Sequence, residues 1–383
     1  MFLHSLKLKN FLSFGSEGTT IELRPLNVII GANGTGKTNL LEAMQFLCGA
    51  QQGNWHINRV DDWLWKGAGN ETEKATATVE AIFEGPEGPL RYAMSFQSEE
   101  GNLKVSEERI EAENPEGTQD YFYDFNNGDP FISVGYQRRK SSHSKPNLNR
   151  SILSRIEYPT GCPELVYLAK NLSEIRIYKD WTFGWQMHLR YMESINSPGN
   201  LLSQNSANLY AILGRIREDE AVKQRLLKEL KEFYIGFEDF DLVVDGNALQ
   251  LVFLEKGLSA PVPASRLSDG ALRYLSFLAI LLNPDLPPLI CIDEPELGLH
   301  CDALLSLTEL IRETSEKCQI IITTHSQMIV DVLSKTPEAV LVCEKTDKGT
   351  KLTRLDGEKL KPLLEQYSLG ELWSKGEIGG NRW

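Results

Sequence analysis

The sequence has no long apolar run, and this absence argues against a membrane-spanning protein. A helix needs about 20 consecutive apolar residues to cross a bilayer, and no stretch of the 383 residues approaches that length. The first residues, MFLHSLKLKNF, also lack the apolar stretch and the small-residue cleavage site of a signal peptide. We therefore expect a folded, soluble protein of the cytoplasm with no membrane partner.

Cysteine is scarce, and its spacing argues against a zinc site. No two of the six cysteines form the C-x-x-C pair that is typical of zinc sites. Several lie within apolar runs that indicate strands, so we expect reduced cysteines in the core and no bound zinc. The six residues are Cys48, Cys162, Cys291, Cys301, Cys318 and Cys343.

Positive charge is in the minority, because 40 Lys and Arg residues stand against 53 Asp and Glu residues, for a net charge of −13. This balance opposes non-specific binding to nucleic acid, so any contact with DNA has to be local.

One stretch reverses the balance, since residues 131–156 contain no acidic residue. It is either a patch that contacts phosphates of DNA or a solvated loop, and we slightly favour the loop. Its basic residues are Arg138, Arg139, Lys140, Lys145, Arg150 and Arg155.

The strongest motif is GANGTGKT at residues 31–38, which fits the pattern G-x-x-x-x-G-K-[ST]. An apolar strand is predicted before it, at residues 27–30, and a helix after it, at residues 38–46. Such a loop turns backbone N–H groups toward a phosphate at the positive end of the helix. Lys37 would reach the β- and γ-phosphates, and the Thr38 hydroxyl would ligate Mg²⁺. The predicted nucleotide-binding residues are Gly31, Ala32, Asn33, Gly34, Thr35, Gly36, Lys37, Thr38 and Asn39.

Two later apolar strands, predicted at residues 289–292 and 320–323, end in polar residues that can carry chemistry. Ligands of α/β sheets lie at this carboxyl edge of the strands. Asp293 would hold Mg²⁺ through water, and Glu294 would orient and deprotonate an attacking water. His325 follows the second strand and would sense the γ-phosphate.

A further anion site is predicted where Leu267-Ser268-Asp269-Gly270 opens an apolar helix at residues 271–282. The phosphates already have a binding loop at residues 31–38. We therefore expect Ser268, Asp269 and Gly270 to contact the γ-phosphate that is bound by a second copy of the chain.

The middle of the chain differs in character from both ends. Strand-like runs separated by Gly, Pro and Asn predict antiparallel hairpins over residues 75–134. Helices are predicted at residues 163–172, 207–216 and 220–233, and a hairpin at residues 239–253 turns at Asp245-Gly246-Asn247. No heptad pattern is present, which excludes a long coiled-coil arm. The connection at residues 51–70, with Trp55, Trp63 and Trp65, either covers a nucleotide or caps the core.

The motifs together resemble the ATP-binding-cassette ATPases of the SMC, RecF and OLD branch, and are most similar to small ATPases of the AAA_21 type. The resemblance rests on residues 31–38, on LSDG at residues 267–270, on IDEPELGLH at residues 292–300 and on TTHS at residues 323–326, in the family's order. It covers roughly residues 1–44 and 266–341 and implies an ATPase with ATP and Mg²⁺ as cofactors.

The implied fold is an α/β head of the ABC type with a central, mostly parallel sheet. Residues 1–74 would form its N-terminal part, residues 75–265 a β-lobe and a helical insertion, and residues 266–383 its C-terminal part. Family members hold two ATP between two heads, which implies a homodimer in which Ser268 and Gly270 act on the partner's ATP. Lys37 and Thr38 match the phosphate and Mg²⁺ residues of the family, Asp293 the metal carboxylate, Glu294 the general base, and His325 the switch histidine.

Some features depart from the family pattern. The sequence LSDGALR stands where transporters carry LSGGQ, and the glutamine of the Q-loop has no assignable position between Gln51 and Gln97. No TOPRIM-like nuclease domain is predicted after His325, since only a short hairpin at residues 339–355 and a tail follow. In this branch, that pattern implies a separate effector protein, often a nuclease of an anti-phage defence system.

Three functional classes follow from these observations. The first is an SMC-like ATPase that dimerises on ATP and controls a partner nuclease, and the second is a RecF-like repair ATPase that binds DNA itself. The third, a transporter ATPase subunit, is least favoured because roughly 230 residues separate Lys37 from Ser268, about twice the separation in the transporter ATPases that the motifs resemble. Direct DNA binding with a steep salt dependence would favour the second class over the first.

Overall fold

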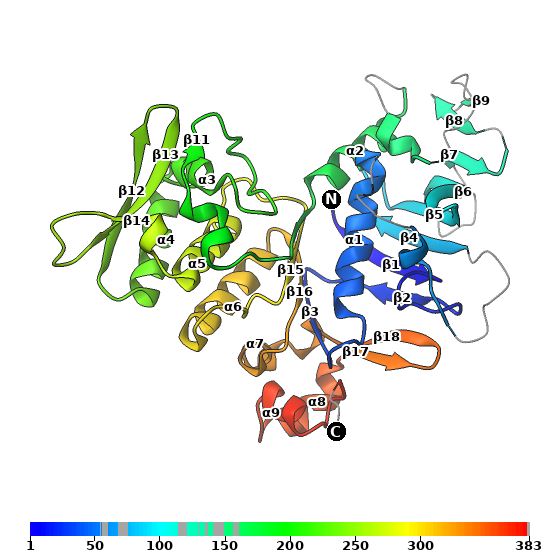
Figure 1. The fold of residues 1–383 in the computed structure, drawn as a ribbon. Coiled ribbons are helices and arrows are strands. Elements are labelled where there is room, and N and C mark those ends of the chain that lie inside the picture. Colours follow the sequence, from blue (N-terminus) through cyan, green and yellow to red (C-terminus); the bar gives the residue numbers. More distant parts are fainter. Residues whose placement is uncertain are drawn as a thin grey trace. The chain divides into compact units, whose positions relative to one another are not determined.

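The computed structural model describes residues 1–53, 55, 60–67, 76–113, 121–128, 130–134, 137–140, 149–155 and 161–380. The chain forms two compact units, whose elements are labelled in Figure 1. Unit 1 comprises Met1–Ile175, Glu338–Gly357 and Gly376–Trp383, and unit 2 comprises Arg176–Pro337 and Glu358–Lys375. The predicted β-lobe therefore belongs to unit 1, whereas most of the predicted helical insertion belongs to unit 2.

Unit 1 contains an antiparallel sheet of eight strands in the order β2-β1-β4-β5-β6-β7-β8-β9. In β4 every second side chain is buried, as expected where one face of an antiparallel sheet packs on a core. The hairpins predicted over residues 75–134 are confirmed, and the two N-terminal strands join the same sheet. The bounds are β1 Leu3–Lys9, β2 Thr19–Glu22, β4 Ala77–Phe83, β5 Leu90–Glu99, β6 Asn102–Ala112, β7 Tyr121–Asn126, β8 Phe131–Val134 and β9 Gln137–Lys140.

The glycine-rich loop of unit 1 lies between β3 (Leu26–Ile30) and α1 (Lys37–Gln52). Strand β3 is buried along its whole length and pairs in parallel with β17 (Val340–Thr346). Strand β17 in turn pairs with β18 (Gly349–Arg354) as the predicted antiparallel hairpin. A second helix of this unit, α2, spans Pro163–Glu174.

An aromatic cluster around Phe46 fixes α1 in the core of unit 1. The ring of Phe46 lies 4.9 Å from that of Phe96 on β5, 5.2 Å from that of Trp63 and 5.6 Å from that of Trp55. Both tryptophans are buried. Trp55 and Trp63 therefore cap the core, which is one of the two roles predicted for residues 51–70.

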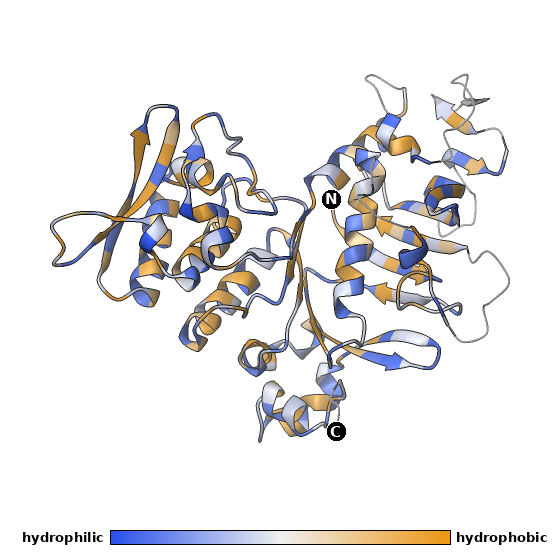
Figure 2. Ribbon diagram, viewed as in Figure 1, coloured by the Kyte–Doolittle hydropathy of each residue, from blue (hydrophilic) through white to orange (hydrophobic). Residues whose placement is uncertain are grey.

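Unit 2 contains three parallel strands, β10 (Arg176–Tyr178), β15 (Leu289–Asp293) and β16 (Gln319–Thr323). Strands β15 and β16 are almost wholly buried, and Figure 2 colours them mostly orange. Together with the β3–β17 pair of unit 1, they confirm the predicted α/β class with a mostly parallel component. The other strands of unit 2 are β11 Glu193–Ser194, β12 Phe237–Asp245, β13 Ala248–Glu255 and β14 Val262–Pro263.

The other α-helices in the described part of the chain belong to unit 2. Their bounds are α3 Leu209–Ile216, α4 Glu220–Phe233, α5 Asp269–Leu281, α6 Cys301–Ser315, α7 Gln327–Val332, α8 Gly357–Leu364 and α9 Leu369–Ser374. The longest helix in the described part of the chain is α1, with 16 residues. None of these helices approaches the length of a coiled-coil arm.

The tail of the chain folds back onto the helix that follows His325. Helix α9 begins with a capping box formed by Ser368 and Glu371. The backbone N–H of Gly370 donates to Asp331 Oδ1 (2.8 Å), and that of Leu369 donates to Ser334 Oγ (2.9 Å). These bonds attach α9 to α7 and the turn after it.

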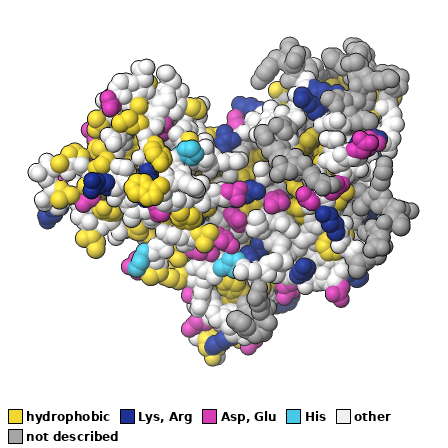
Figure 3. Space-filling model, viewed as in Figure 1, with side chains coloured by type: hydrophobic (Ala, Val, Ile, Leu, Met, Phe, Trp, Pro, Cys, Tyr) yellow, Lys and Arg dark blue, Asp and Glu magenta, His cyan; other side chains and the backbone are white. Residues whose placement is uncertain are grey.

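Two surface features complete the description. Five of the cysteines are buried, but Cys301, the first residue of α6, is exposed, so the prediction of a core position is wrong for this one. Apolar side chains also reach the surface of unit 2, where Trp185, Tyr191 and Val244 are exposed, and Figure 3 shows such side chains around β11–β14. Among the described helices, none combines the length and apolarity needed to cross a membrane.

Candidate functional site

The loop between β3 and α1 depends on glycines that adopt left-handed backbone conformations. Gly34 has φ 78° and Gly36 has φ 107°, which other residues reach only with strain. A Cβ on Gly36 would lie 2.5 Å from Ser13 Oγ and closer still to Thr350 Oγ1, whereas a Cβ on Gly34 would meet nothing within 4 Å. Packing therefore requires glycine at position 36, and backbone conformation alone favours it at position 34.

Hydrogen bonds from distant parts of unit 1 hold this loop in shape. The hydroxyl of Thr350 on β18 donates to the carbonyl of Thr35 (2.6 Å) and lies 2.7 Å from the Ser13 hydroxyl. The hydroxyl of Thr35 donates to the carbonyl of Ala32 (2.9 Å). Ser13 and Thr350 are supporting residues that the sequence did not reveal, because they are far from the motif in the chain.

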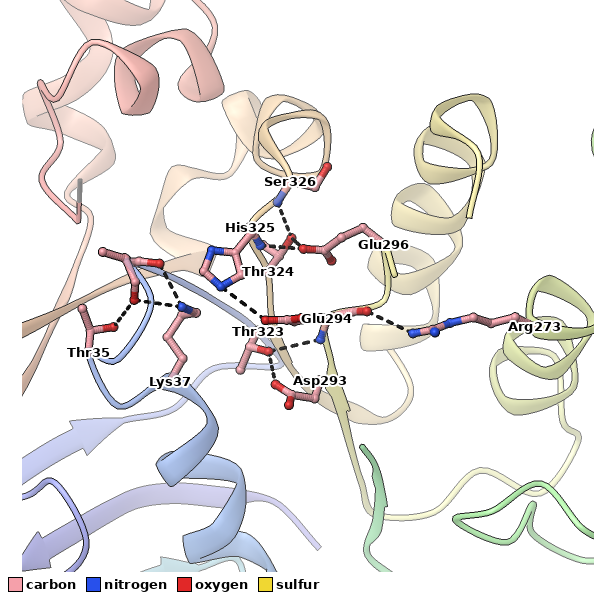
Figure 4. A network of polar contacts seen from close by, with 12 residues as sticks. Thr35, Lys37, Arg273, Asp293, Glu294, Glu296, Thr323, Thr324, His325 and Ser326 are labelled. Carbon is pink, nitrogen blue, oxygen red and sulfur yellow. Dashed lines mark hydrogen bonds and ion pairs between the residues drawn. The ribbon is translucent and has the colours of Figure 1, made fainter. Parts of the chain in front are cut away.

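Lys37 lies against the loop and is only 6% exposed. Its ammonium group donates to the carbonyls of Gly31 (2.9 Å) and Ala32 (3.1 Å), as Figure 4 shows. Helix α1 begins at Lys37, and Gly36 at its N-cap supplies no side-chain acceptor. A phosphate at this helix end would therefore meet backbone N–H donors and the cation of Lys37.

The remaining predicted residues of the loop also fit a role in binding a nucleotide and its cation. Thr38 is the second residue of α1 and is exposed, so its hydroxyl is accessible to a cation. Asn33 is also exposed, and Asn39 is half-buried on the first turn of α1. Hydroxyl and carboxylate oxygens are the hard donors that Mg²⁺ prefers, so Thr38 and Asp293 have suitable chemistry for it.

In unit 2, the predicted acidic pair lies in a constrained turn at the end of β15. Asp293 is the last residue of the strand, and its carboxylate accepts a hydrogen bond from the Thr323 hydroxyl of β16. Glu294 has φ 46°, a left-handed conformation that is uncommon outside glycine. Its backbone N–H donates to the carbonyl of Thr323 (3.1 Å). Residues that are held in such uncommon backbone conformations cluster at functional sites.

The carboxylate of Glu294 meets the predicted histidine. Glu294 Oε1 lies 3.3 Å from His325 Nε2, and both side chains are about one-third exposed. Glu296 supports this pair, since its Oε1 accepts from the His325 backbone N–H (2.6 Å) and from the Thr324 hydroxyl (2.9 Å). Burial raises the pKa of Glu296 above its ordinary value. The sequence did not single out Glu296, although it stands two residues after Glu294.

The residues predicted to reach a partner's phosphate open α5. Ser268 is the N-cap residue, and its hydroxyl accepts from the backbone N–H of Ala271 (3.1 Å). A Cβ on Gly270 would lie 3.1 Å from the carbonyl of Gly298. Asp269 is engaged within its own unit, because its carboxylate binds the Arg190 guanidinium and accepts from the Gly184 N–H (2.8 Å). The hydrogen bond from Arg190 lowers the pKa of Asp269.

Part of the basic stretch is also described. Arg138, Arg139 and Lys140 belong to β9, the last strand in the order of the eight-stranded sheet. Arg150 is exposed. Lys145 lies outside the described residues, and so do several residues between Gln51 and Gln97, where the Q-loop glutamine has no assignable position.

Comparisons with known proteins agree with the motifs. A protein-family model described as "AAA domain, putative AbiEii toxin, Type IV TA system" matches residues 26–331. The chain is 24% identical over 345 residues to the OLD nuclease of Thermus scotoductus, covering 86% of this chain and 60% of the relative. It is 23% identical over 351 residues to an ATP/GTP phosphatase of Helicobacter pylori, covering 87% of this chain and 88% of that protein.

The fold is also similar to solved structures. The head of an SMC protein, crystallised with the C-winged helix domain of ScpA, matches with a TM-score of 0.59 at 16% identity. The match covers 94% of this chain and 99% of that chain. This likeness confirms the predicted head fold. The chain spans only about three fifths of the Thermus nuclease.

Proposed function

Because this chain belongs to the AAA_21 family of AAA-domain proteins, whose model matches residues 26–331, we propose that it binds ATP with Mg²⁺ and hydrolyses the ATP to ADP and phosphate. One observation carries the proposal furthest. The N-terminus of α1 has no side-chain cap from Gly36, and the ammonium of Lys37 is held at the same loop. This is the arrangement that binds the phosphates of a nucleotide.

The residues of the chain have distinct roles in the proposed reaction. The backbone N–H groups of the loop and Lys37 bind the phosphates, and Thr38 and Asp293 would hold Mg²⁺, which supplies charge neutralisation when bound. Glu294 orients the attacking water and accepts its proton. His325 contacts the carboxylate of Glu294 (3.3 Å) and so helps to fix the base and to sense the γ-phosphate.

Hydrolysis is proposed to occur in a homodimer. Ser268 and Gly270 open α5 and would complete the site around ATP that is bound by the other subunit. Asp269 contributes to this site through the shape of the loop, since Arg190 and Gly184 already bind its carboxylate. Dimerisation would then depend on ATP, by the linkage that lets a ligand favour the state that binds it best.

The proposed biological role is the control of a separate effector, a nuclease of the TOPRIM-like kind in anti-phage defence, by a protein of the cytoplasm. The name of the Thermus relative, a nuclease, supports this class of partner. A RecF-like role with direct DNA binding is the second candidate, and the basic sequence of β9 favours it. The two candidates differ in whether the purified chain alone binds DNA.

The nucleotide site is tested with Lys37→Ala. At an ATP concentration of one hundred times Kd, binding stabilises a protein by about 2.7 kcal/mol, which a melting experiment detects. We expect ATP with Mg²⁺ to raise the Tm of the parent and not that of Lys37→Ala, and phosphate release to be lost with it. Melting without ATP checks that the variant is folded, because the substitution also removes the hydrogen bonds from Lys37 to the carbonyls of Gly31 and Ala32.

Lys348→Ala is the matched control for this experiment. Lys348 is an exposed lysine of the same unit, and it pairs with Glu17 at 2.6 Å. It should retain both the ATP-dependent rise in Tm and the phosphate release of the parent. Undiminished stabilisation of Lys37→Ala by ATP would exclude the loop as the nucleotide site.

A further inference from the structure

The turn that carries Glu294 is fixed by side chains from several elements of unit 2. One nitrogen of Arg273, Nη2, donates to the carbonyl of Glu294 (3.1 Å), as Figure 4 shows. The indole N–H of Trp181 donates to the carbonyl of Asp293 (3.3 Å), and Thr323 accepts from the N–H of Glu294. The left-handed conformation of Glu294 is therefore held from both sides of the residue.

The guanidinium of Arg273 occupies a place that is unfavourable for a charge. Arg273 is 1% exposed, and its Cζ lies 4.4 Å from the centre of the Trp181 ring, with Phe183 and Phe277 at 5.2 and 5.6 Å. Burial lowers its pKa to about 10, so it stays charged at neutral pH. In the described part of the chain, Nε and Nη1 have no hydrogen-bond partner.

A buried charge with two unpaired donors lowers stability relative to an apolar side chain of similar size. The aromatic rings around it recover part of this loss through cation–π contacts. Apolar residues such as methionine would fill the same space without the penalty. The presence of arginine therefore points to a role for its hydrogen bond and its charge.

The position of Arg273 on α5 suggests what that role is. Ser268 caps the N-terminus of α5, and Arg273 lies little more than one turn further along the same helix. A helix moves as a rigid element over so short a distance. Any displacement of Ser268 would reach the carbonyl of Glu294 through the Arg273 bond.

We infer that Arg273 is a positioning residue that holds the proposed base Glu294 beside His325 and connects it to the helix that carries Ser268. This inference rests on the proposed function, because it takes Glu294 to be the base. Arg273 touches neither the nucleotide nor the attacking water in this assignment. It acts through the backbone of Glu294.

Two substitutions separate the hydrogen bond from the packing. Arg273→Met keeps most of the length and volume but has no donor and no charge, and Arg273→Lys keeps the charge. Arg273→Met removes the hydrogen bond that the charged guanidinium donates to the carbonyl of Glu294, which should lower kcat by about ten- to hundredfold, with KM for ATP unchanged within about twofold. Arg273→Lys should recover part of kcat. Arg312→Met is the matched control, because Arg312 is a half-exposed arginine of α6 paired with Glu309, and the kcat of this variant should equal the parent's.

A double-mutant cycle tests whether Arg273 acts through Glu294. If it does, adding Arg273→Met to Glu294→Gln should cause no further fall in the residual rate of phosphate release. Equal proportional losses in both backgrounds, or a kcat of Arg273→Met equal to the parent's, would overturn the inference. If Arg273→Met does not fold, which melting without ATP reveals, Arg273→Lys decides by the same cycle.

Failure of the proposed function looks different in the same measurements. A parent protein that releases no phosphate, or a Glu294→Gln variant as fast as the parent, would contradict the ATPase or the base. A parent that hydrolyses ATP and a slow Glu294→Gln variant, together with an unaffected Arg273→Met, would contradict only the role of Arg273.

Discussion

Adding a single methyl group to two glycines of the phosphate loop should have different consequences, although both lie in the same motif. Gly34→Ala and Gly36→Ala each place an alanine at positive φ, which costs about 1–2 kcal/mol. Only at Gly36 does the new Cβ meet the hydroxyls of Ser13 and Thr350. Overpacking of this kind adds about 1–3 kcal/mol.

The difference is measurable by thermal melting without ATP. For a unit of this size, 1 kcal/mol corresponds to about 2–4 °C, so Gly36→Ala should melt about 2–12 °C below Gly34→Ala. Gly36→Ala should also lose ATP affinity, because the carbonyl of Thr35 and the start of α1 have to shift. Equal melting temperatures for the two variants would refute the role of Ser13 and Thr350 as residues that pack against the loop at Gly36 and support it.

Two further predictions concern charged residues. Replacing Arg138, Arg139 and Lys140 by alanine should weaken DNA binding and reduce the slope of log K against log salt by about 0.9 for each lost phosphate contact; an unchanged affinity and slope would leave the stretch as a solvated loop. Asp269→Asn should lower the Tm at pH 7, because Arg190 lowers the pKa of Asp269 in the folded protein. The contribution of such a carboxylate is present above its ordinary pKa and is lost as the pH falls through the lowered folded value, so the deficit should shrink in acid. A deficit in Tm that does not change with pH would contradict a lowered pKa of Asp269 in the folded protein.

The parts of the fold that the sequence predicted well are those encoded by neighbouring residues. The strand, loop and helix around residues 31–38 follow from local hydrophobic patterning and glycine placement, and so do β15 and β16. Boundaries were less accurate. Helix α1 continues to Gln52, beyond the predicted end at residue 46, and α5 begins at Asp269 because Ser268 caps it.

The parts that sequence reasoning missed depend on contacts between distant residues. The hydroxyl of Thr350 donates to the carbonyl of Thr35 across more than three hundred positions of the chain. The indole N–H of Trp181 donates to the carbonyl of Asp293, which is 112 positions away. Arg273 looks like an ordinary helix residue until its burial is known. Helix α9 could have been found, because Ser368 and Glu371 have the spacing of a capping box.

Glu294→Gln tests whether the ATPase site of this chain is completed by a second subunit. This change keeps the size and most hydrogen bonds of the side chain but removes the proton acceptor, so ATP should be bound and not cleaved. The closed state should therefore accumulate as a homodimer with ATP and Mg²⁺. Adding Ser268→Arg, which places a bulky cation where the partner's γ-phosphate has to approach, should abolish the dimer while ATP affinity persists.

Ser268→Ala in the same background measures the loss of the α5 cap alone, which costs about 1 kcal/mol. The most direct measurement is the mass in solution of Glu294→Gln, with and without ATP and Mg²⁺. A dimer that forms only with ATP and disappears with Ser268→Arg is the predicted result. A mass that responds neither to ATP nor to Ser268→Arg would contradict the two-subunit site.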